Sequence, residues 1–391
     1  MFENRILQRS MNLINKDSLA SYYLDFFRGV ASIAVLLHHL RPGFFVQYEQ
    51  VEHKNILIQL LFLLSTKGYQ AVMIFFVLSG FFISASVLKL IIRGEWSWKR
   101  YLTNRIVRLW IVLLPALLLI YIWNIFSIAL YGDQAIVGEM SWETLLTNIF
   151  FLQGLRGFPF IPFGHNEPLW SLSYEFWYYI LFPCIVLVLS SKKILNKLIY
   201  GILAIIIGIM LGKNGMLLFL VWLLGTVVLL LPRINIPKNS ILKIGLLIAP
   251  ILMFFAAMVL SGREKTFLIN FIVGLTFSAI VYTFIIFYNG KYLTKNSLFG
   301  RISLILAGFS YTLYLTHYPV NNFIKSFIGE RYLLQPTVAN IGLFILTLIL
   351  IISYAWLISI VTEAKTDKVR SLVTRVTAGI FVRGKNQNEA I

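Results

Sequence analysis

The sequence predicts an all-α, polytopic membrane protein with about ten transmembrane helices. Of its 391 residues, 59% are hydrophobic and only 13% are charged, whereas about a quarter of the residues in a soluble domain are charged. The apolar runs recur along the whole chain and leave room only for short loops and tails. Lysine and arginine fall between these runs and not in one basic block, which argues against nucleic-acid binding and is typical of membrane topology signals.

A transmembrane helix needs about 20 mostly apolar residues. Ten segments meet or approach this length, at residues 24–44, 69–92, 106–130, 169–190, 197–212, 215–232, 241–261, 267–288, 302–323 and 337–362. Two further apolar segments, 56–64 and 145–152, are too short to span, and we expect them to be interfacial or re-entrant. The first run lacks a small-residue cleavage site, so we expect a retained helix and not a signal peptide.

The distribution of basic residues predicts that both termini are cytoplasmic. With the N-terminus inside, the inner segments collect 25 lysines and arginines and the outer segments nine. An even number of spans then brings the basic tail to the same side. The tail's basic residues near the last span are Lys365, Lys368, Arg370 and Arg375. We therefore divide the chain into a cytoplasmic segment 1–23, a transmembrane domain 24–362 and a cytoplasmic tail 363–391.

The first span carries three ionisable residues on one face. Arg28 and His39 are eleven residues apart, so at 100° per residue they end about 20° from each other and about 17 Å apart along the axis. Asp25 can pair with Arg28 one turn away. A charged side chain in the membrane core costs roughly 2.5–3.5 kcal/mol or more, so such residues usually face a protein cavity. The alternative is a snorkelling arginine with a histidine at the outer headgroups, which is the interpretation we prefer for His38.

Small and basic residues mark the next two spans. Ser79 and Gly80 allow another helix to approach closely, and ordinary packing explains them better than a direct role for Ser79. Tyr101, Arg105 and Arg108 share a helical face at the inner end of the third span, where arginines could hold phosphates bidentately. For the two arginines, orientation of the helix by lipid headgroups is an equal alternative.

The fourth span carries a carboxylate about two turns from its start. Glu175 shares its helical face with Ser171, and an unpaired carboxylate there would be costly, so we expect it to be neutral, paired or catalytic. The loop before it, residues 163–168, suits acceptor binding or is simply solvated. The single Cys184 lies in the same apolar run, which excludes an intramolecular disulfide, and we expect no metal site.

A polar stripe crosses the ninth span. Ser310, Tyr314 and His317 follow the helical spacing i, i+4, i+7, and His317 lies about 24 Å from the inner end of the helix. His39, Glu175 and His317 would thus reach the outer half of the membrane from three helices, which predicts one buried site. A histidine can act as a general base near neutral pH, and a carboxylate can orient it.

Five motifs, in this order, resemble those of the acyltransferase-3 family of integral membrane acyltransferases. They are Leu24-Asp25 through Arg28-Gly29 to His39, Phe75-Phe76-Val77-Leu78-Ser79-Gly80-Phe81, Arg105 with Arg108, Trp170-Ser171-Leu172-Ser173 with Glu175, and Ser310-Tyr311-Thr312-Leu313-Tyr314-Leu315-Thr316-His317-Tyr318-Pro319. The match covers nearly the whole chain, and five motifs in order are specific although each alone is weak. The resemblance implies a ten-helix domain that transfers an acyl group, usually acetyl, from cytoplasmic acyl-CoA to a hydroxyl of a glycan or lipid-linked saccharide.

The resemblance also implies roles for individual residues. His39 corresponds to the catalytic histidine, Arg28 to its supporting residue, and Arg105 and Arg108 to a basic pair on the CoA side. The remaining candidates are Glu175 and His317 for the catalytic core, Tyr101 for the cofactor side, and Asp25, Trp170, Ser173, Ser310 and Tyr314 for the substrate. Acetyl-CoA is the implied donor co-substrate.

The implied location is a bacterial cytoplasmic (inner) membrane, with the glycan acceptor and membrane lipids as partners and a homo-oligomer as an open possibility. The esterase-like domain that some family members carry after the membrane part is not expected here. The main alternative is a transporter or flippase of glycans or lipids, which the lack of a detectable inverted repeat disfavours.

Overall fold

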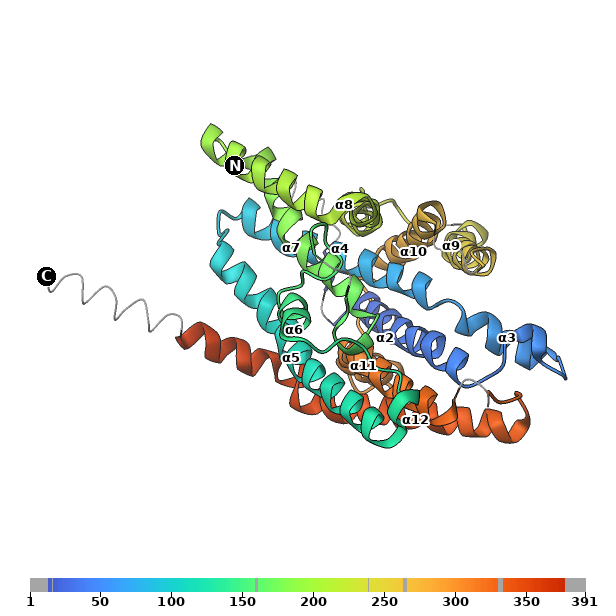
Figure 1. Ribbon diagram of the computed structural model, residues 1–391. Helices are drawn as coiled ribbons and strands as arrows, with labels where there is room; N and C mark the ends of the chain where they lie inside the picture. Colours follow the sequence, from blue (N-terminus) through green and yellow to red (C-terminus); the bar gives the residue numbers. More distant parts are fainter. Residues whose placement is uncertain are drawn as a thin grey trace, which may run out of the picture.

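The computed structural model describes residues 13–15, 17–158, 161–237, 239–262, 266–329 and 333–376, and these residues form helices and loops without a named strand (Figure 1). The long helices are α2 (Leu19–Leu40), α4 (Gly68–Ile92), α5 (Trp98–Tyr131), α7 (Leu169–Ser190), α8 (Ile194–Leu230), α9 (Ser240–Leu260), α10 (Phe267–Tyr288), α11 (Leu298–Ile328) and α12 (Val338–Val361). The short elements are α3 (Ile56–Ser65), α6 (Trp142–Ile149), η1 (Arg41–Gly43), η2 (Tyr48–Gln50), η3 (Gly132–Gln134), η4 (Phe163–His165) and η6 (Glu363–Lys365).

The prediction of an all-α polytopic membrane protein is confirmed. Among the described residues, nine helices are long and apolar enough to cross a membrane. The predicted spans 197–212 and 215–232 both fall within α8, where the chain bends at Gly212 with φ 63° and ψ −173°. Figure 1 shows the two arms of α8 running in different directions. The cytoplasmic placement of the termini stays a prediction, and residues 1–12 and 377–391 lie outside the described residues.

Local sequence signals set where the helices that carry the motifs begin. Ser18, Ser97 and Ser297 precede α2, α5 and α11, and each side chain accepts the backbone N–H three residues further on. Such a cap satisfies one of the N–H groups that the first helical turn leaves unpaired. The two short apolar segments of the sequence form α3 and α6.

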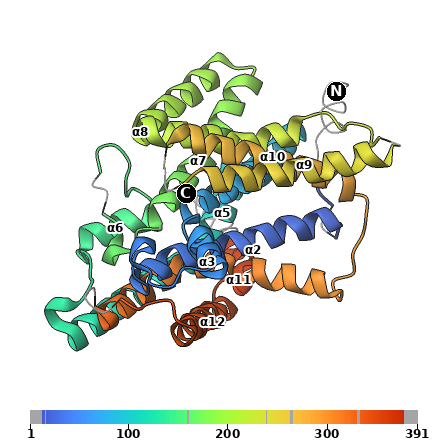
Figure 2. The same cartoon turned by 90° about the vertical axis from the view of Figure 1, so that its right-hand side faces the viewer.

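The helices pack around α2, which contacts α4 on one side and α11 on the other. α9 lies on the outer right-hand side in Figure 1, and α12 lies at the lower edge in Figure 2. α9 has no buried residue, as expected for a helix whose side chains face lipid. The interior helices therefore bury the motif residues, and the outer helices provide the apolar surface.

Glycines bring α4 and α8 into backbone contact. A Cβ at Gly80 would overlap the Trp222 carbonyl, and a Cβ at Gly225 would overlap the Val77 carbonyl. Small residues at both contact points let two helices approach more closely than larger side chains permit. The expectation that Gly80 serves helix packing agrees with this geometry.

A buried lysine joins the start of α4 to the end of α9. The Nζ of Lys67 donates to the Gly262 carbonyl at 3.0 Å and to the Ser261 hydroxyl at 3.3 Å. The lysine precedes the span, and burial lowers the pKa of its ammonium group because the charged form loses water.

Candidate functional site

Two adjoining cavities lie among α2, α4, α7 and α11. The larger has a volume of about 830 Å³, and we call it the histidine cavity. Its polar and aromatic lining residues are His38, His39, Tyr69, His165, Glu167, Trp170, Tyr174, Asn214, Phe267, Asn270, Tyr314, Tyr318 and Lys325. The smaller has a volume of about 460 Å³, and we call it the arginine cavity. Its polar lining residues are Ser21, Asp25, Arg28, Ser79, Arg105, Arg108, Ser171, Glu175, Tyr179, Ser310, Tyr311, Tyr314 and Arg370.

The two cavities follow each other along the helix axes. Asp25 and Arg28 of α2 line the arginine cavity, whereas His38 and His39 at the other end of α2 line the histidine cavity. α4 and α11 are divided between the two cavities in the same way, whereas the residues of α7 that line the two cavities alternate along the helix. Because a helix rises 1.5 Å per residue, Arg28 and His39 are about 17 Å apart along α2. The predicted site residues are therefore divided between two chambers and do not meet in one.

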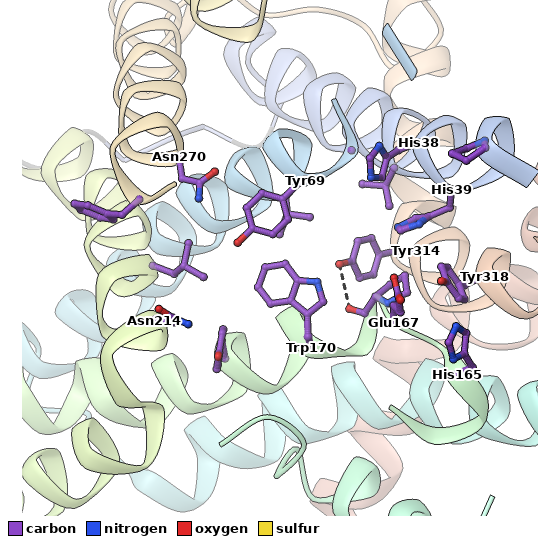
Figure 3. Close-up of a pocket in the computed structure, with 18 of the residues that line it drawn as sticks. His38, His39, Tyr69, His165, Glu167, Trp170, Asn214, Asn270, Tyr314 and Tyr318 are labelled. Carbon is purple, nitrogen blue, oxygen red and sulfur yellow. Dashed lines mark hydrogen bonds between the residues drawn. The ribbon is translucent and has the colours of Figure 1, made fainter. Parts of the chain in front are cut away.

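His39 lies in a cluster of aromatic rings at one end of the histidine cavity. Its ring centroid is 4.8 Å from that of Tyr318 and 5.4 Å from that of His317, both on α11. Figure 3 shows His39, Tyr318, His165 and Glu167 gathered at this end of the cavity. The Tyr318 hydroxyl interacts with Glu167. A histidine, a phenol and a carboxylate thus surround the space in which a reacting hydroxyl could lie.

His317 stands behind His39 and does not line either cavity. It is fully buried, and its Nδ1 lies 2.8 Å from the Leu313 carbonyl. A carbonyl can only accept, so Nδ1 carries the proton and Nε2 presents its lone pair. This Nε2 has no hydrogen-bond partner among the described residues. His317 can therefore influence a bound substrate only through neighbours that line the cavity, such as His39 and Tyr318.

His38 also lines the histidine cavity, although the sequence favoured a place among the outer headgroups for it. Its Nδ1 lies 3.2 Å from the Ser65 carbonyl and its ring is 5.1 Å from that of His39. The close approach of Gly68 to the His38 side chain brings the start of α4 against this part of α2. Both adjacent histidines are thus accessible to a molecule in the cavity.

Aromatic rings and amides form the rest of the histidine cavity. Trp170 and Tyr69 stack with centroids 5.4 Å apart and planes at 18°. Figure 3 shows this pair in the middle of the cavity and Asn214 and Asn270 at the end away from the histidines. Flat apolar faces combined with a few amide groups suit a ring compound that carries hydroxyl groups.

Tyr314 and Val72 line both cavities and form the wall between them. The Tyr314 hydroxyl is hydrogen-bonded to the Ser171 hydroxyl at 2.7 Å and donates to the Pro168 carbonyl at 3.2 Å. These bonds join α11 to the start of α7. The same bonds hold Tyr314 in its place between the two cavities.

The arginine cavity contains four guanidinium groups and two carboxylates. They belong to Arg28, Arg105, Arg108, Arg370, Asp25 and Glu175. The Nε–H groups of Arg28 and Arg105 are buried and have no hydrogen-bond partner among the described residues. Buried donors are normally paired, so these unused N–H groups indicate a cavity suited to an anion.

Arg28 is fixed from two sides. One guanidinium nitrogen lies 3.3 Å from Asp25 and donates to the Ala307 carbonyl of α11 at 3.2 Å. The hydroxyl of Ser310 donates to the same carbonyl at 3.0 Å. This geometry holds Arg28 in the arginine cavity, too far along α2 to touch a group reacting at His39.

Glu175 belongs to a chain of hydrogen bonds across three helices. It accepts from the Tyr179 hydroxyl at 2.5 Å, the Ser79 hydroxyl lies 3.4 Å from that of Tyr179, and the indole N–H of Trp222 donates to Ser79 at 3.2 Å. Ser79 therefore has a direct polar role that the sequence did not favour. The network fixes the carboxylate in the arginine cavity.

Two predicted binding residues lie away from both cavities. Tyr101 is buried, donates to the Tyr179 carbonyl at 2.9 Å and lies under the Arg105 guanidinium, 5.5 Å from ring centroid to charge. Ser173 donates to the Phe151 carbonyl at 2.7 Å. Tyr101 thus supports Arg105, and Ser173 fixes the loop before α7.

Comparison with known proteins agrees with this architecture. A sequence family described as an acyltransferase domain matches residues 21–360, which is most of the chain. The chain belongs to the acyltransferase-3 family. It is 30% identical over 156 residues to acyltransferase MdmB of Streptomyces mycarofaciens, covering 40% of this chain and 36% of that protein. It is also 28% identical over 138 residues to an uncharacterized protein of Haemophilus influenzae, covering 34% of this chain and 55% of that protein. No solved structure matches the chain.

The chain thus matches at most about half the length of these curated relatives. The family resemblance that the sequence motifs indicated is confirmed.

One charged residue near the arginine cavity was not among the residues that the sequence singles out. Glu363 follows the last span directly, and one of its carboxylate oxygens accepts from both the backbone N–H and the hydroxyl of Thr312, each at 3.1 Å. It lies near Arg28 and Arg108 and adds a third carboxylate to their surroundings. A glutamate in a short polar segment carries no periodic signal, so only the three-dimensional fold reveals it.

Proposed function

We propose that this protein is a membrane O-acyltransferase that moves an acyl group, acetyl in the simplest case, from cytoplasmic acyl-CoA to a hydroxyl of a cell-surface glycan or lipid-linked saccharide. The observation that carries this proposal is the pair of adjoining cavities with different chemistry. One is rich in guanidinium groups and the other in histidine and aromatic rings, and they share the wall formed by Val72 and Tyr314. Such a reaction would take place in a bacterial inner membrane.

The donor would occupy the arginine cavity. Acyl-CoA carries several phosphate charges at one end and its thioester at the other, joined by a flexible arm. Arginine binds phosphate through paired N–H groups, and the unused Nε–H groups of Arg28 and Arg105 supply such donors. The arm would then pass Tyr314 to bring the thioester to His39.

The acceptor would occupy the histidine cavity. A sugar ring has apolar faces that pack on aromatic rings and hydroxyl groups that need hydrogen-bond partners. The stacked pair of Trp170 and Tyr69 offers the first, and Asn214 and Asn270 offer the second. Membrane lipids would surround the outer helices.

His39 would perform the proton transfer. It either takes the proton of the acceptor hydroxyl while that oxygen attacks the thioester, or itself receives the acyl group first. In both routes the C–S bond of the donor breaks, an ester C–O bond forms, and the hydroxyl proton ends on the CoA thiol. Tyr318 and Glu167 surround the same space and could stabilise the charge that develops there.

The test is transfer of label from acetyl-CoA to envelope glycans in membranes that contain the protein. Wild type should transfer the label, and His39→Ala should lose it while its membrane level stays normal. His53→Ala is the matched control, because His53 is exposed and lines neither cavity. Full activity of His39→Ala would refute the assignment of His39. No transfer by wild type from acetyl- or succinyl-CoA would favour a transporter of glycans or lipids.

A further inference from the structure

The chain beyond the last span folds back onto the arginine cavity. η6 packs against α11, α12 and α5, and Glu363 fastens it to Thr312 of α11 through two hydrogen bonds of 3.1 Å. Figure 1 shows the chain continuing from there as the red helix. The attachment point lies two residues from Ser310, which lines the arginine cavity. This segment is therefore part of the site's surroundings and not only a solvated tail.

Arg370 reaches the arginine cavity from this segment. It lines the cavity together with Arg28, Arg105 and Arg108. One of its terminal nitrogens donates to Asp367 at 2.8 Å, which restrains the side chain. Its Nε–H is buried and has no hydrogen-bond partner among the described residues.

Three of the four arginines of this cavity therefore share one unusual feature. Arg28, Arg105 and Arg370 each present a buried Nε–H without an acceptor. They come from α2, α5 and the segment after α12, which are far apart in sequence. An anion with several oxygens would satisfy these donors together, and phosphate groups match the geometry of a guanidinium fork.

We propose that Arg370 binds a phosphate at the nucleotide end of the acyl-CoA donor, so that residues 363–370 complete the donor site. This inference rests on the proposed function. The thioester must extend toward His39, so the nucleotide end of the donor lies at the opposite, Asp25 end of the arginine cavity. Arg370 adds one guanidinium there, beyond the pair at Arg105 and Arg108.

The binding energy from this contact is available before and during the reaction alike, because the phosphates do not react. Its loss should therefore raise KM for the donor and leave kcat nearly unchanged. One charge-assisted hydrogen bond to phosphate corresponds to about a tenfold change in KM or more. KM for a donor without phosphates should stay the same.

The experiment compares wild type, Arg370→Ala, Arg370→Lys and Arg375→Ala with two donors, acetyl-CoA and S-acetyl-pantetheine. Arg375 is the matched control, because it lies on the same helical segment, is exposed and does not line the cavity. Arg370→Ala should raise KM for acetyl-CoA about tenfold or more and leave KM for S-acetyl-pantetheine unchanged. Arg370→Lys should recover part of the loss, and Arg375→Ala should behave as wild type.

Three results would overturn the inference. They are an unchanged KM of Arg370→Ala for acetyl-CoA, an equal loss with both donors, and an equal effect of Arg375→Ala. Binding of desulfo-CoA to the purified wild-type protein separates this failure from a failure of the proposed function. If wild type binds desulfo-CoA and transfers acetyl, only the role of Arg370 is refuted; if it does neither, the acyl-CoA donor and Arg370's role are refuted together.

Discussion

Replacing Gly80 by alanine tests the link between helix packing and the arginine cavity. The added methyl group would overlap the Trp222 carbonyl, which is backbone and cannot rotate away. α8 must therefore move away from α4. Because the indole of Trp222 donates to Ser79, and Ser79 contacts the Tyr179 hydroxyl that holds Glu175, the shift would reach the carboxylate in the cavity.

The expected magnitude follows from two opposing terms. Overpacking a well-packed contact costs about 1–3 kcal/mol, and the upper end applies here because backbone is displaced. Alanine gains about 1 kcal/mol over glycine in helix propensity. Gly80→Ala should therefore lower the free energy of unfolding by about 2 kcal/mol. Gly201→Ala in α8 has no atom within 4 Å of the new methyl, so it should retain the propensity gain.

The free energy of unfolding can be measured with SDS as denaturant in mixed micelles, and acyl transfer can be measured on the same preparations. The two alanine variants should differ by about 3 kcal/mol, and only Gly80→Ala should lose activity. Equal stability of the two variants would show that α4 and α8 do not touch at Gly80. Normal activity in a destabilised Gly80→Ala protein would show that the packing of α4 against α8 does not affect the position of Glu175.

Three further changes probe other contacts. Tyr314→Phe removes the bond to Ser171, so it should lower the free energy of unfolding by about 1–2 kcal/mol and slow acyl transfer; unchanged transfer would show that the wall is not part of the reaction path. Glu363→Gln keeps an oxygen that can accept from Thr312, whereas Glu363→Ala does not. Glu363→Ala should therefore lower the free energy of unfolding in SDS by about 1–3 kcal/mol more than Glu363→Gln does. An equal loss of stability in the two variants would contradict this. The lowered pKa of Lys67 means that the unfolded chain binds its proton more readily, so the free energy of unfolding should rise with pH between that lowered value and the ordinary lysine range. Lys67→Met should flatten this rise when the free energy of unfolding is measured against pH. An unchanged slope in the variant would show that Lys67 does not cause the rise.

Hydrophobic periodicity was sufficient to predict the fold class and most spans, because a membrane requires long apolar helices. The predicted spans 197–212 and 215–232 correspond to the two arms of α8, which meet at Gly212. Lys213 and Asn214 interrupt the apolar run, and the structure connects the two arms through a single non-helical residue, Gly212. Composition cannot distinguish a bend of one residue from a short loop.

The sequence predicts which site residues of one helix lie on the same face, but not how residues of different helices meet. Spacing correctly placed Asp25 and Arg28 within pairing distance, and Ser310 with Tyr314 on one polar face of α11. It could not show that Val72 and Tyr314 divide the space, because that wall forms from different helices. It also gave no reason to select Arg370, since a basic residue after a span is normally a topology signal.

The division into two cavities resolves an electrostatic conflict in the proposed reaction. A histidine that accepts a proton becomes positively charged, and an arginine 4 Å away would oppose this by about 4 kcal/mol at an effective dielectric constant of about 20. At about 17 Å, the axial separation of Arg28 and His39, the same opposition falls to about 1 kcal/mol. Phosphate binding and base catalysis can thus coexist in one membrane domain only if the donor spans both cavities. The thioester would therefore have to pass the wall formed by Val72 and Tyr314 to meet the acceptor hydroxyl at His39.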